Sequence, residues 1–444
     1  MAKERRRRKS LITGVAVTAG GMLGITQPAL ADTFQVNASD DSGDGVCQDV
    51  AAGDCTLRDA VIESNGNGGA FDDITFASSI TGVTLGGTQL DVTEGVYIQG
   101  NGADATTISG NDASRLFGLD PGENEPVAFR NLTLTGGAAG GGYGGAIYNH
   151  DANIEISGSV LTLNSANKGG AIFDPGTTGE NTEITDSTIS DNTALDDGAA
   201  FFAGGSAGRI FNSTISGNHA GATGDDYGGG LFIGDDSYLY DSTVAGNSAG
   251  YGGGIYVNGG SAFVYNTIVG DNTATAPGGN FPPGQDVYGQ VTAAFSLIQT
   301  TDGTTVTEDP AGSNLIGSDP QLGLLQDNGG TTPTQKPALS SPVIDKGLSD
   351  SSVDQRGSSR PFDVPSIANA SGGDAADMGS VELQAPDFAA PPPAGGSTPP
   401  PAASVTATGQ RAAALKKCKQ RAKKKHWAKK RLKKCKRKAR RLPV

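Results

Sequence analysis

A short phrase recurs through the middle of this chain, and it limits the possible folds more than any other feature. Between Ser213 and Gly260 the phrase S-T-[IV]-x-G-N-x-A occurs twice, followed by a variable polar loop, consecutive glycines and an apolar–aromatic pair. Periods of about 20 to 50 residues are typical of stacked units that bury their apolar faces on their neighbours. Related phrases on both sides put six aliphatic residues in register at such a period: Leu134, Leu161, Ile189, Ile215, Val244 and Ile268.

Two further columns accompany the aliphatic one. Asparagines recur at Asn164, Asn192, Asn218, Asn247 and, one residue late, Asn272. Aromatic residues follow pairs of small residues at Tyr148, Phe173, Phe202, Phe232 and Tyr256. With one turn per repeat, like residues stack about 4.8 Å apart and form ladders. We expect the aromatic column to be a buried ladder, and stacking on sugar rings is the alternative.

The segments between these columns have the length and composition of short strands, and no helical pattern separates them from Ile74 to Gly137. Parallel sheets usually need crossover helices, which leaves an antiparallel sandwich or a solenoid in which the chain coils. A sandwich does not require columns of like residues. The 68 glycines also suit a repetitive β architecture better than long helices. The predicted fold is therefore an all-β parallel solenoid with coils over residues 74–300 and capped ends.

The first 31 residues have the pattern of a signal peptide. Basic residues from Lys3 to Lys9 precede an apolar run from Leu11 to Ile25, and Ala29-Leu30-Ala31 is typical of a cleavage site after Ala31. An uncleaved membrane anchor is the alternative, but the run is shorter than the roughly 20 residues that span a bilayer. We expect a secreted protein at the cell wall or cell surface, without a transmembrane span after cleavage.

Residues 32–73 are predicted to form an N-terminal cap. Phe34 to Val36 has the pattern of a strand, and Thr56-x-x-Asp59 is typical of a capped helix start. Cys47 and Cys55 lie eight positions apart. Since exported proteins commonly oxidise such pairs, we expect a disulfide between them.

Three stretches carry a resemblance to known families. The segments CTLRDAV, DDITF and GTQLDVTEGVYIQGNGADATTISGNDASRLF resemble the CSLREA module of exported bacterial β-helix proteins. The GG-A-I-[FY] and S-T-I-S-x-N repeats are similar to those of polymorphic outer membrane proteins. SPVIDKG, DQRGSSRP and DAADMGSVE resemble the end of the choice-of-anchor Q group. The resemblance implies a right-handed parallel β-helix of the pectate-lyase-like superfamily.

Residues 301–384 are predicted to form the last coils and a cap over the open end of the stack. Arg356 and Arg360 are the only arginines there. We interpret them as parts of a structural ion-pair network, with a catalytic site as the alternative. The acidic residues around them are Asp345, Asp354, Asp363, Asp377 and Glu382.

The charge of the chain is strongly divided. Residues 411–444 contain 18 Lys and Arg and no acidic residue, whereas the span from 11 to 410 has 9 basic and 46 acidic residues, a net charge of −37. A Pro-rich stretch over 385–410 separates them and is expected to act as an extended linker. We expect the tail to bind an anionic wall or envelope polymer. Nucleic acid would also suit its charge but not export. The pairing of Cys418 and Cys435 stays open.

The sequence supports only weak site predictions. Asp225, Asp226, Asp235 and Asp236 are candidate Ca²⁺ ligands, and solvated turns are the alternative. His150 and His219 are expected to be lone exposed histidines. No catalytic or cofactor-binding residue is assigned.

The predicted function is that of a structural, adhesin-like surface protein. The alternative is a polysaccharide lyase or glycoside hydrolase that acts on acidic glycans.

Overall fold

The structure is a computed structural model that describes residues 31–47, 54–66, 68, 71–122, 125–176, 181–221, 225–276 and 284–388. The chain divides into two compact units, residues 1–388 and 389–444. Three predicted parts of the chain lie outside the described residues. They are the signal peptide up to residue 30, the linker from residue 389 and the basic tail, which contains Cys418 and Cys435.

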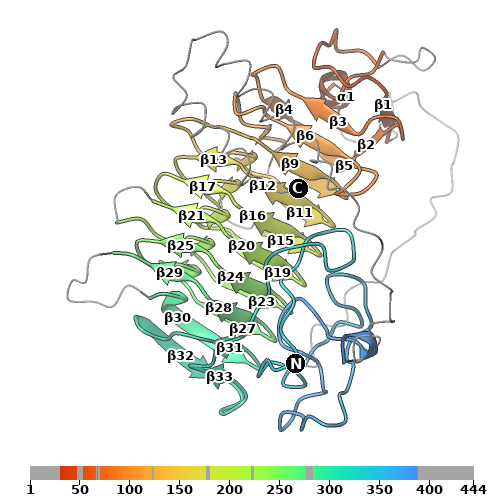
Figure 1. Cartoon of the computed structure of the whole chain (residues 1–444). Coiled ribbons are helices and arrows are strands. Elements are labelled where there is room, and N and C mark those ends of the chain that lie inside the picture. Colours follow the sequence, from red (N-terminus) through yellow and green to blue (C-terminus); the bar gives the residue numbers. More distant parts are fainter. Residues whose placement is uncertain are drawn as a thin grey trace, which may run out of the picture. The chain divides into compact units, whose positions relative to one another are not determined.

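The described part of the first unit is a parallel β-helix, as the repeats predict (Figure 1). One coil contains β10 (Ile147–Asn149), β11 (Asn153–Ser157), β12 (Val160–Thr162) and the short β13 (Ser165–Ala166). Each of these strands pairs in parallel with the corresponding strand of the next coil. The stack therefore has three main faces and one short corner sheet.

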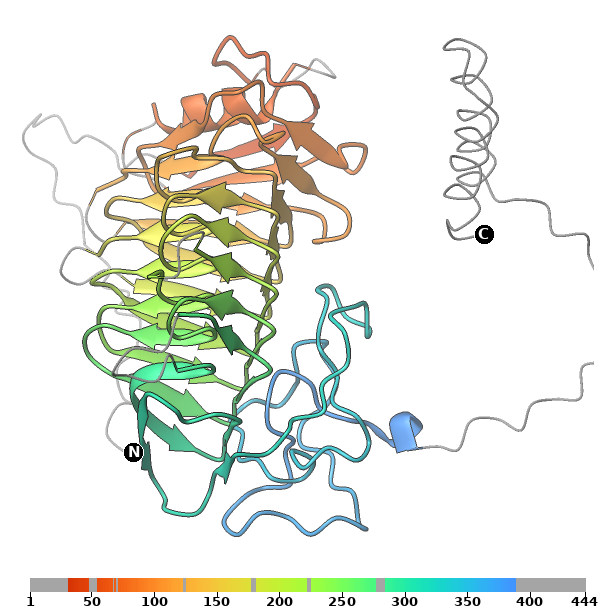
Figure 2. The same ribbon diagram turned by 60° about the vertical axis from the view of Figure 1, so that its left-hand side comes forward.

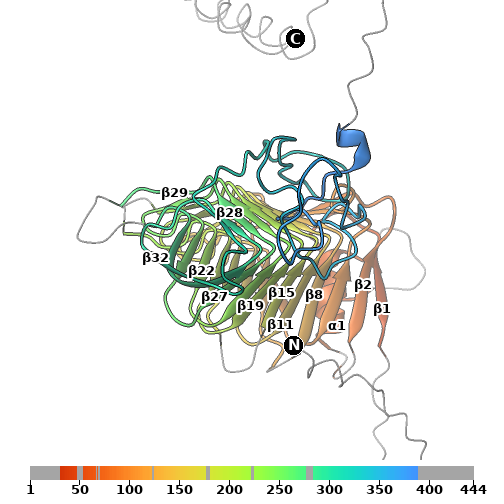
Figure 3. The ribbon, with the colours of Figure 1, turned by 90° about the horizontal axis from the view of Figure 1, so that it is seen from below.

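The face that contains β11 is called the long face here, and Figure 3 shows its strands in succession from β1 to β32. Its other strands are β1 (Thr33–Val36), β2 (Asp72–Phe76), β5 (Val96–Gln99), β8 (Pro126–Arg130), β15 (Asn181–Thr185), β19 (Ala207–Phe211), β23 (Ser237–Tyr240), β27 (Ala262–Tyr265), β30 (Val287–Ala294) and β32 (Thr304–Glu308).

The face that contains β10 is called the aromatic face. Its other strands are β4 (Leu90–Val92), β7 (Phe117–Leu119), β14 (Ile172–Asp174), β18 (Phe201–Ala203), β22 (Leu231–Ile233) and β26 (Ile255–Val257). β30 pairs with both β26 and β27, so it joins this face to the long face.

The face that contains β12 is called the covered face, and β13 belongs to the corner sheet. The covered face also has β3 (Gly82–Thr84), β6 (Thr107–Ser109), β9 (Thr133–Thr135), β16 (Thr188–Ser190), β20 (Thr214–Ser216), β24 (Thr243–Ala245), β28 (Ile268–Gly270), β31 (Leu297–Ile298) and β33 (Leu315–Ile316). The corner sheet continues through β17 (Thr193–Ala194), β21 (His219–Ala220), β25 (Ser248–Ala249) and β29 (Thr273–Ala274).

The aliphatic column forms the core side of the covered face. Leu134, Leu161, Ile189, Ile215 and Val244 pair in register and are fully buried. The last member of the column was predicted wrongly, because Val244 pairs with Val269 and not with Ile268. This shift also explains why Asn272 seemed one residue late, since it follows Val269 at the same interval as Asn247 follows Val244.

The asparagine ladder is confirmed. The side-chain amide of Asn192 donates to Asn218 Oδ1 at 2.9 Å, and the amide of Asn218 donates to Asn247 Oδ1 at 2.9 Å. Each of these amides also donates to a main-chain carbonyl of the preceding coil. The ladder ends where Asn272 donates to Asp286, whose pKa is raised to about 6 by burial.

The sharp corner between the long and covered faces uses residues that tolerate a left-handed backbone. Asp186, Asn212, Asp241 and Asn266 occupy it in four successive coils, with φ angles between 46° and 52°. Asparagine and aspartate adopt this conformation more readily than other side chains with a Cβ atom. Their presence at this corner therefore follows from backbone geometry.

The N-terminal end has the predicted helix and disulfide. Helix α1 (Leu57–Ser64) begins with a capping box between Thr56 and Asp59, and it buries Leu57, Ala60 and Val61. Cys47 and Cys55 form a disulfide. These features occur at the end of the stack where a cap is expected.

The segment 317–388, called the C-terminal segment here, lies along the side of the stack (Figure 2). It contains a short 3-10 helix, η1 (Ala385–Phe388). The Gln355 amide donates to Thr188 Oγ1 and accepts a hydrogen bond from Thr214, and the Ser380 main chain donates to Thr243. These threonines lie on three successive strands of the covered face. The segment thus covers a lateral face, whereas we predicted that it would close the open end.

The predicted ion-pair network is present in this segment. Arg356 pairs with Asp354 at 2.7 Å, and Arg360 pairs with Glu382 and with Asp241, each at 3.1 Å. Asp241 belongs to the coils, so the network connects the segment to the stack. Among the five predicted acidic residues, Asp354 and Glu382 form these ion pairs. Asp345 and Asp377 instead accept hydrogen bonds from main-chain amides, and Asp363 is exposed.

The helices of the described residues are α1 and η1, and neither has the length and hydropathy that a membrane-spanning helix needs.

Candidate functional site

The aromatic column forms a stacked ladder, as predicted, but it lies on the outer side of the coils and only part of it is buried. Phe173 and Phe232 are buried at 7% exposure each, whereas Tyr148, Phe202 and Tyr256 are half-buried. In β10, β14, β18, β22 and β26 the preceding residue points into the core and the aromatic residue points outward. The inward positions are fully or almost fully buried: Ile147, Ile172, Phe201, Leu231 and Ile255. The outward rings pair in register and continue to Tyr288 in β30.

The outward rings stack on one another along the aromatic face. Their centroids lie 4.8 Å apart for Phe173 and Phe202, and 4.4 Å apart for Phe202 and Phe232. The interplanar angles are 17° and 10°. Each ring in the middle of the ladder therefore has both of its faces against neighbouring rings, and mainly its edge is left for solvent.

A second row of side chains, called the flanking row, runs beside the ladder. It occupies the position before each pair of glycine or small residues and comprises Tyr143, Lys168, Asp197, Tyr227 and Tyr251. Tyr143 stacks on Phe173, Tyr227 lies against Tyr256, and Tyr251 meets the edge of Tyr288, so each contacts the ring of the following coil. Lys168 lies over Phe202 in the same way, 5.4 Å from its centroid.

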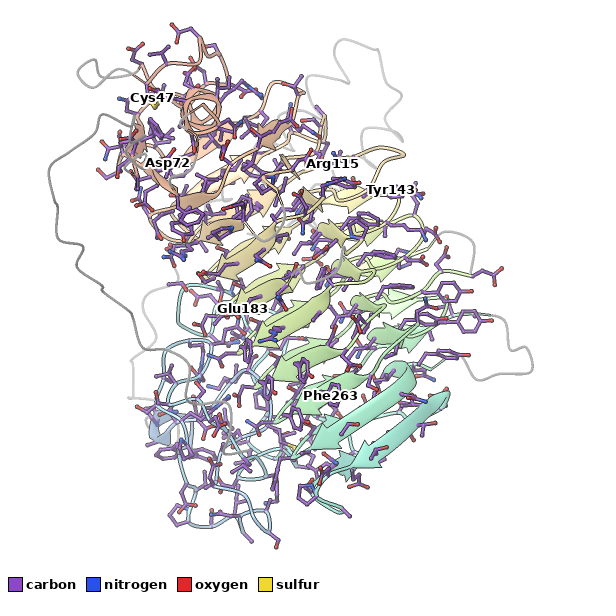
Figure 4. All side chains as sticks on the ribbon, turned by 180° about the vertical axis from the view of Figure 1, so that it is seen from behind. Cys47, Asp72, Arg115, Tyr143, Glu183 and Phe263 are labelled. Carbon is purple, nitrogen blue, oxygen red and sulfur yellow. A yellow bond between two sulfur atoms is a disulfide. The ribbon has the colours of Figure 1, made fainter. Side chains whose placement is uncertain are left out.

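The N-terminal end of the ladder is covered by an arginine. Arg115 lies over the Tyr148 ring, 4.9 Å from its centroid, and donates to the main-chain carbonyl of Tyr143. Figure 4 shows Arg115 beside Tyr143. A guanidinium on an aromatic face contributes about 0.5–1 kcal/mol at exposed sites. The Arg115 guanidinium therefore covers the outer face of the Tyr148 ring at this end of the ladder.

Lys168 brings a basic group close to two carboxylates. Its ammonium lies 2.5 Å from Asp197 and 3.3 Å from Asp196. Burial lowers the pKa of Lys168, but the hydrogen bonds and charges of the two aspartates outweigh burial and raise it overall. Burial also raises the pKa of Asp197. A lysine whose pKa is raised stays protonated at neutral pH and is a poor general base.

The chemistry of the aromatic face follows from this geometry. Sugars stack on open aromatic faces, and most faces in the ladder already contact another ring. A second ladder on the long face has the same stacked arrangement. It consists of Phe211, Tyr240 and Tyr265, with Tyr238 and Phe263 stacked beside them. Both ladders therefore stabilise the stack. Among the rings of the two ladders and the flanking row, that of Tyr143 is the most exposed, at 41%.

The four aspartates predicted to bind Ca²⁺ do not form one ligand group. Asp225 and Asp226 precede β22, and Asp235 and Asp236 follow it. Asp235 and Asp236 accept hydrogen bonds from main-chain amides of the turn and of Ser261. Within the described residues no three of these carboxylates lie together, and Ca²⁺ binding here stays a prediction.

The two histidines differ in their surroundings. His219 lies in β21 of the corner sheet, and its ring lies 2.8 Å from the Ser248 hydroxyl. His150 lies in the turn between β10 and β11, and its ring has carboxylate neighbours in Asp120 and Asp151. The expectation of a lone histidine therefore fails for His150.

Sequence reasoning missed the flanking row and Asp241. The flanking row has a signal, since Tyr143, Lys168, Tyr227 and Tyr251 each stand directly before two glycines. No signal in the sequence marks Asp241, because its partner Arg360 is 119 residues away in the chain.

Comparisons with protein-family models, curated proteins and solved structures found no match. The resemblances to the CSLREA module, to polymorphic outer membrane proteins and to the choice-of-anchor Q group therefore stay predictions. The parallel β-helix rests on the strand pairings of the chain itself.

Proposed function

We propose that this protein is an exported β-helix that acts as a rigid display element on the cell surface or wall. Its basic tail would hold it to an anionic envelope polymer. The observation that carries the proposal is the division of charge, with 18 basic and no acidic residues in 411–444 and a net charge of −37 between residues 11 and 410. Opposite charges on two parts of one chain favour different partners for each.

The coil architecture supports the display role. The asparagine ladder connects each coil to the next without interruption from Asn164 to Asp286. The ladder of the aromatic face does the same from Tyr148 to Tyr288. The C-terminal segment adds a lateral support across several coils. A stack connected in this way resists bending and can present loops at a distance from its attachment point.

The test is a sedimentation assay with purified cell wall at physiological salt. The full chain is expected to co-sediment, and deletion of Arg411 to Val444 should abolish the binding. Replacement of the tail's Lys and Arg by Gln should do the same, whereas a tail with the same residues in permuted order should still bind. Unchanged binding after the deletion would refute the proposal.

A separate assay addresses the enzyme alternative. The full chain is incubated with polygalacturonate and other acidic glycans, and no product is expected, because Asp196 and Asp197 hold the Lys168 ammonium in ion pairs and leave it a poor general base. Product formation that is lost in the Asp197→Asn variant would replace the display role by a catalytic one.

A further inference from the structure

Three potential metal ligands from two successive coils meet at the corner between the aromatic face and the long face. His150 and Asp151 lie in the turn after β10, and Asp120 lies in the equivalent turn after β7. The Nδ1 atom of His150 lies 3.3 Å from Asp120 Oδ1 and 3.8 Å from Asp151 Oδ2. All three ligand atoms lie within 4.8 Å of one another.

These distances fit a shared ion. Nitrogen and carboxylate ligands bind Zn²⁺ at about 2.0–2.2 Å, so two ligands of one ion lie about 3 to 3.5 Å apart in octahedral or tetrahedral geometry. The observed separations need only a small inward movement of side chains. The Asp120 and His150 side chains are 68% and 59% exposed and free to make it.

The main chain holds the two turns together at this corner. The His150 amide donates to the Leu119 carbonyl at 2.9 Å, and the Gly122 amide donates to Asp151 Oδ1 at 3.1 Å. That bond uses one oxygen of Asp151 and leaves Oδ2 on the side of the imidazole. The buried Asn149 side chain closes the same turn through both main-chain groups of Ala152.

The charges of the cluster are not balanced by the protein. Over the described residues, the only ion-pair partner of Asp120 and Asp151 is His150, which is charged only when protonated. A protonated imidazole would offset one of the two carboxylates. A divalent cation would offset both and would use the imidazole in its neutral form, which is the form that binds metals.

We propose that Asp120, His150 and Asp151 form a binding site for a first-row divalent cation such as Zn²⁺ or Mn²⁺. The mixed nitrogen and oxygen set favours these ions over Ca²⁺, which prefers oxygen ligands alone and a higher coordination number. Three protein ligands leave at least one position of the ion open for water or an external ligand. The bound ion would also cross-link two coils.

The experiment uses the three histidines of the full chain, His150, His219 and His426, as separate probes. Imidazole ¹⁵N-correlated NMR spectra are recorded during titration with Zn²⁺ and, in parallel, with Ca²⁺. We expect Zn²⁺ to shift the His150 resonances saturably at one equivalent, and Ca²⁺ to leave them unchanged. The probes separate this site from tail residues, such as His426 and the two tail cysteines, that could also bind Zn²⁺.

Variants decide whether the carboxylates take part. Asp120→Asn and Asp151→Asn should each weaken the Zn²⁺ affinity read at His150 by tenfold or more, whereas His219→Ala should leave it unchanged. Circular dichroism checks that each variant keeps the β-helix. The proposal is overturned if His150 shifts no more than His219, if Asp120→Asn changes the affinity less than twofold, or if Ca²⁺ binds as tightly as Zn²⁺.

Discussion

Single side chains connect each coil to the next, and Asn218 shows how much can depend on one of them. Its Oδ1 accepts from both the main chain and the side chain of Asn192, and its amide donates to Asn247 and to the Ile189 carbonyl. The side chain is fully buried. If the Asn218 side chain were removed, its partners would lose hydrogen bonds that water cannot replace, because the site is buried.

Replacement of Asn218 by Ala should therefore lower the free energy of unfolding by about 3 kcal/mol, since several buried polar groups lose their partners. Urea denaturation followed by circular dichroism measures the change. Asn258→Ala is the matched control, because Asn258 is exposed in a turn and should cost less than about 0.5 kcal/mol. Equal effects of the two variants would show that the ladder does not stabilise the stack.

Strands of three residues carry the aromatic ladder, and their stacking gives an element-level prediction. Phe202 and Phe232 lie on adjacent strands with centroids 4.4 Å apart. A double-mutant cycle with Phe202→Leu and Phe232→Leu should give a coupling energy of about 0.5–1.5 kcal/mol in urea denaturation. Phe202→Leu combined with Tyr265→Leu, on another face, should show no coupling. A coupling energy of zero between Phe202 and Phe232 would mean that each ring stabilises the fold through its own burial and that ring stacking adds nothing.

The element scale also shows what could be predicted from the sequence. The repeat period was sufficient to predict the coils. Residues equivalent to Asn164 or Leu161 in successive repeats can stack on one another only if each repeat makes one turn. The side on which the aromatic rings lie was not predictable. In Ile147-Tyr148 both neighbours are apolar, so a three-residue strand contains no alternation that distinguishes core from surface.

The same limit applies to the candidate sites. The Asp120, His150 and Asp151 cluster joins two coils whose loops differ in length, so no fixed spacing indicates it. The position of the C-terminal segment depends on hydrogen bonds such as that of Gln355 to Thr188, 167 residues apart, which no local pattern encodes. Only the acidic and basic residues of its ion-pair network could be selected in advance.

At the scale of the whole molecule, the C-terminal segment makes stability depend on pH. Asp241, Asp345, Asp354, Asp377 and Glu382 are all buried around Arg356 and Arg360, an excess of carboxyl groups. Burial, together with the charge of Asp377, raises the pKa of Glu382 from 4.5 to about 7, and burial raises that of Asp377 to about 6. The folded state therefore prefers the protonated acids more than the unfolded state does.

The sign of the effect follows from these shifts. A group whose pKa is raised by folding contributes its full stabilisation at pH values below its pKa in the unfolded chain, which is near 4.5 for Glu382. This stabilisation is lost as the pH rises through the pKa in the folded chain, about 7. The segment should be more stable at pH 5 than at pH 8, by on the order of 2–3 kcal/mol. Hydrogen exchange of residues 340–384, corrected for intrinsic rates, measures it. Glu382→Gln should flatten the dependence, and equal protection of the wild-type segment at both pH values would contradict the prediction.

The lateral position of this segment also affects the order in which the chain can assemble. Gln355 bonds to Ser187, which is 168 residues earlier, and Ser380 bonds to Thr214, which is 166 residues earlier. Coils of a stack can form one after another as the polypeptide lengthens, because each needs only its neighbour. The segment, in contrast, follows β33 in the chain and can join coils only after all of them have been synthesised. A nascent chain that ends between residue 317 and Gln355 would contain all the coils and still lack the contacts of Gln355 and Ser380 that hold several of them together.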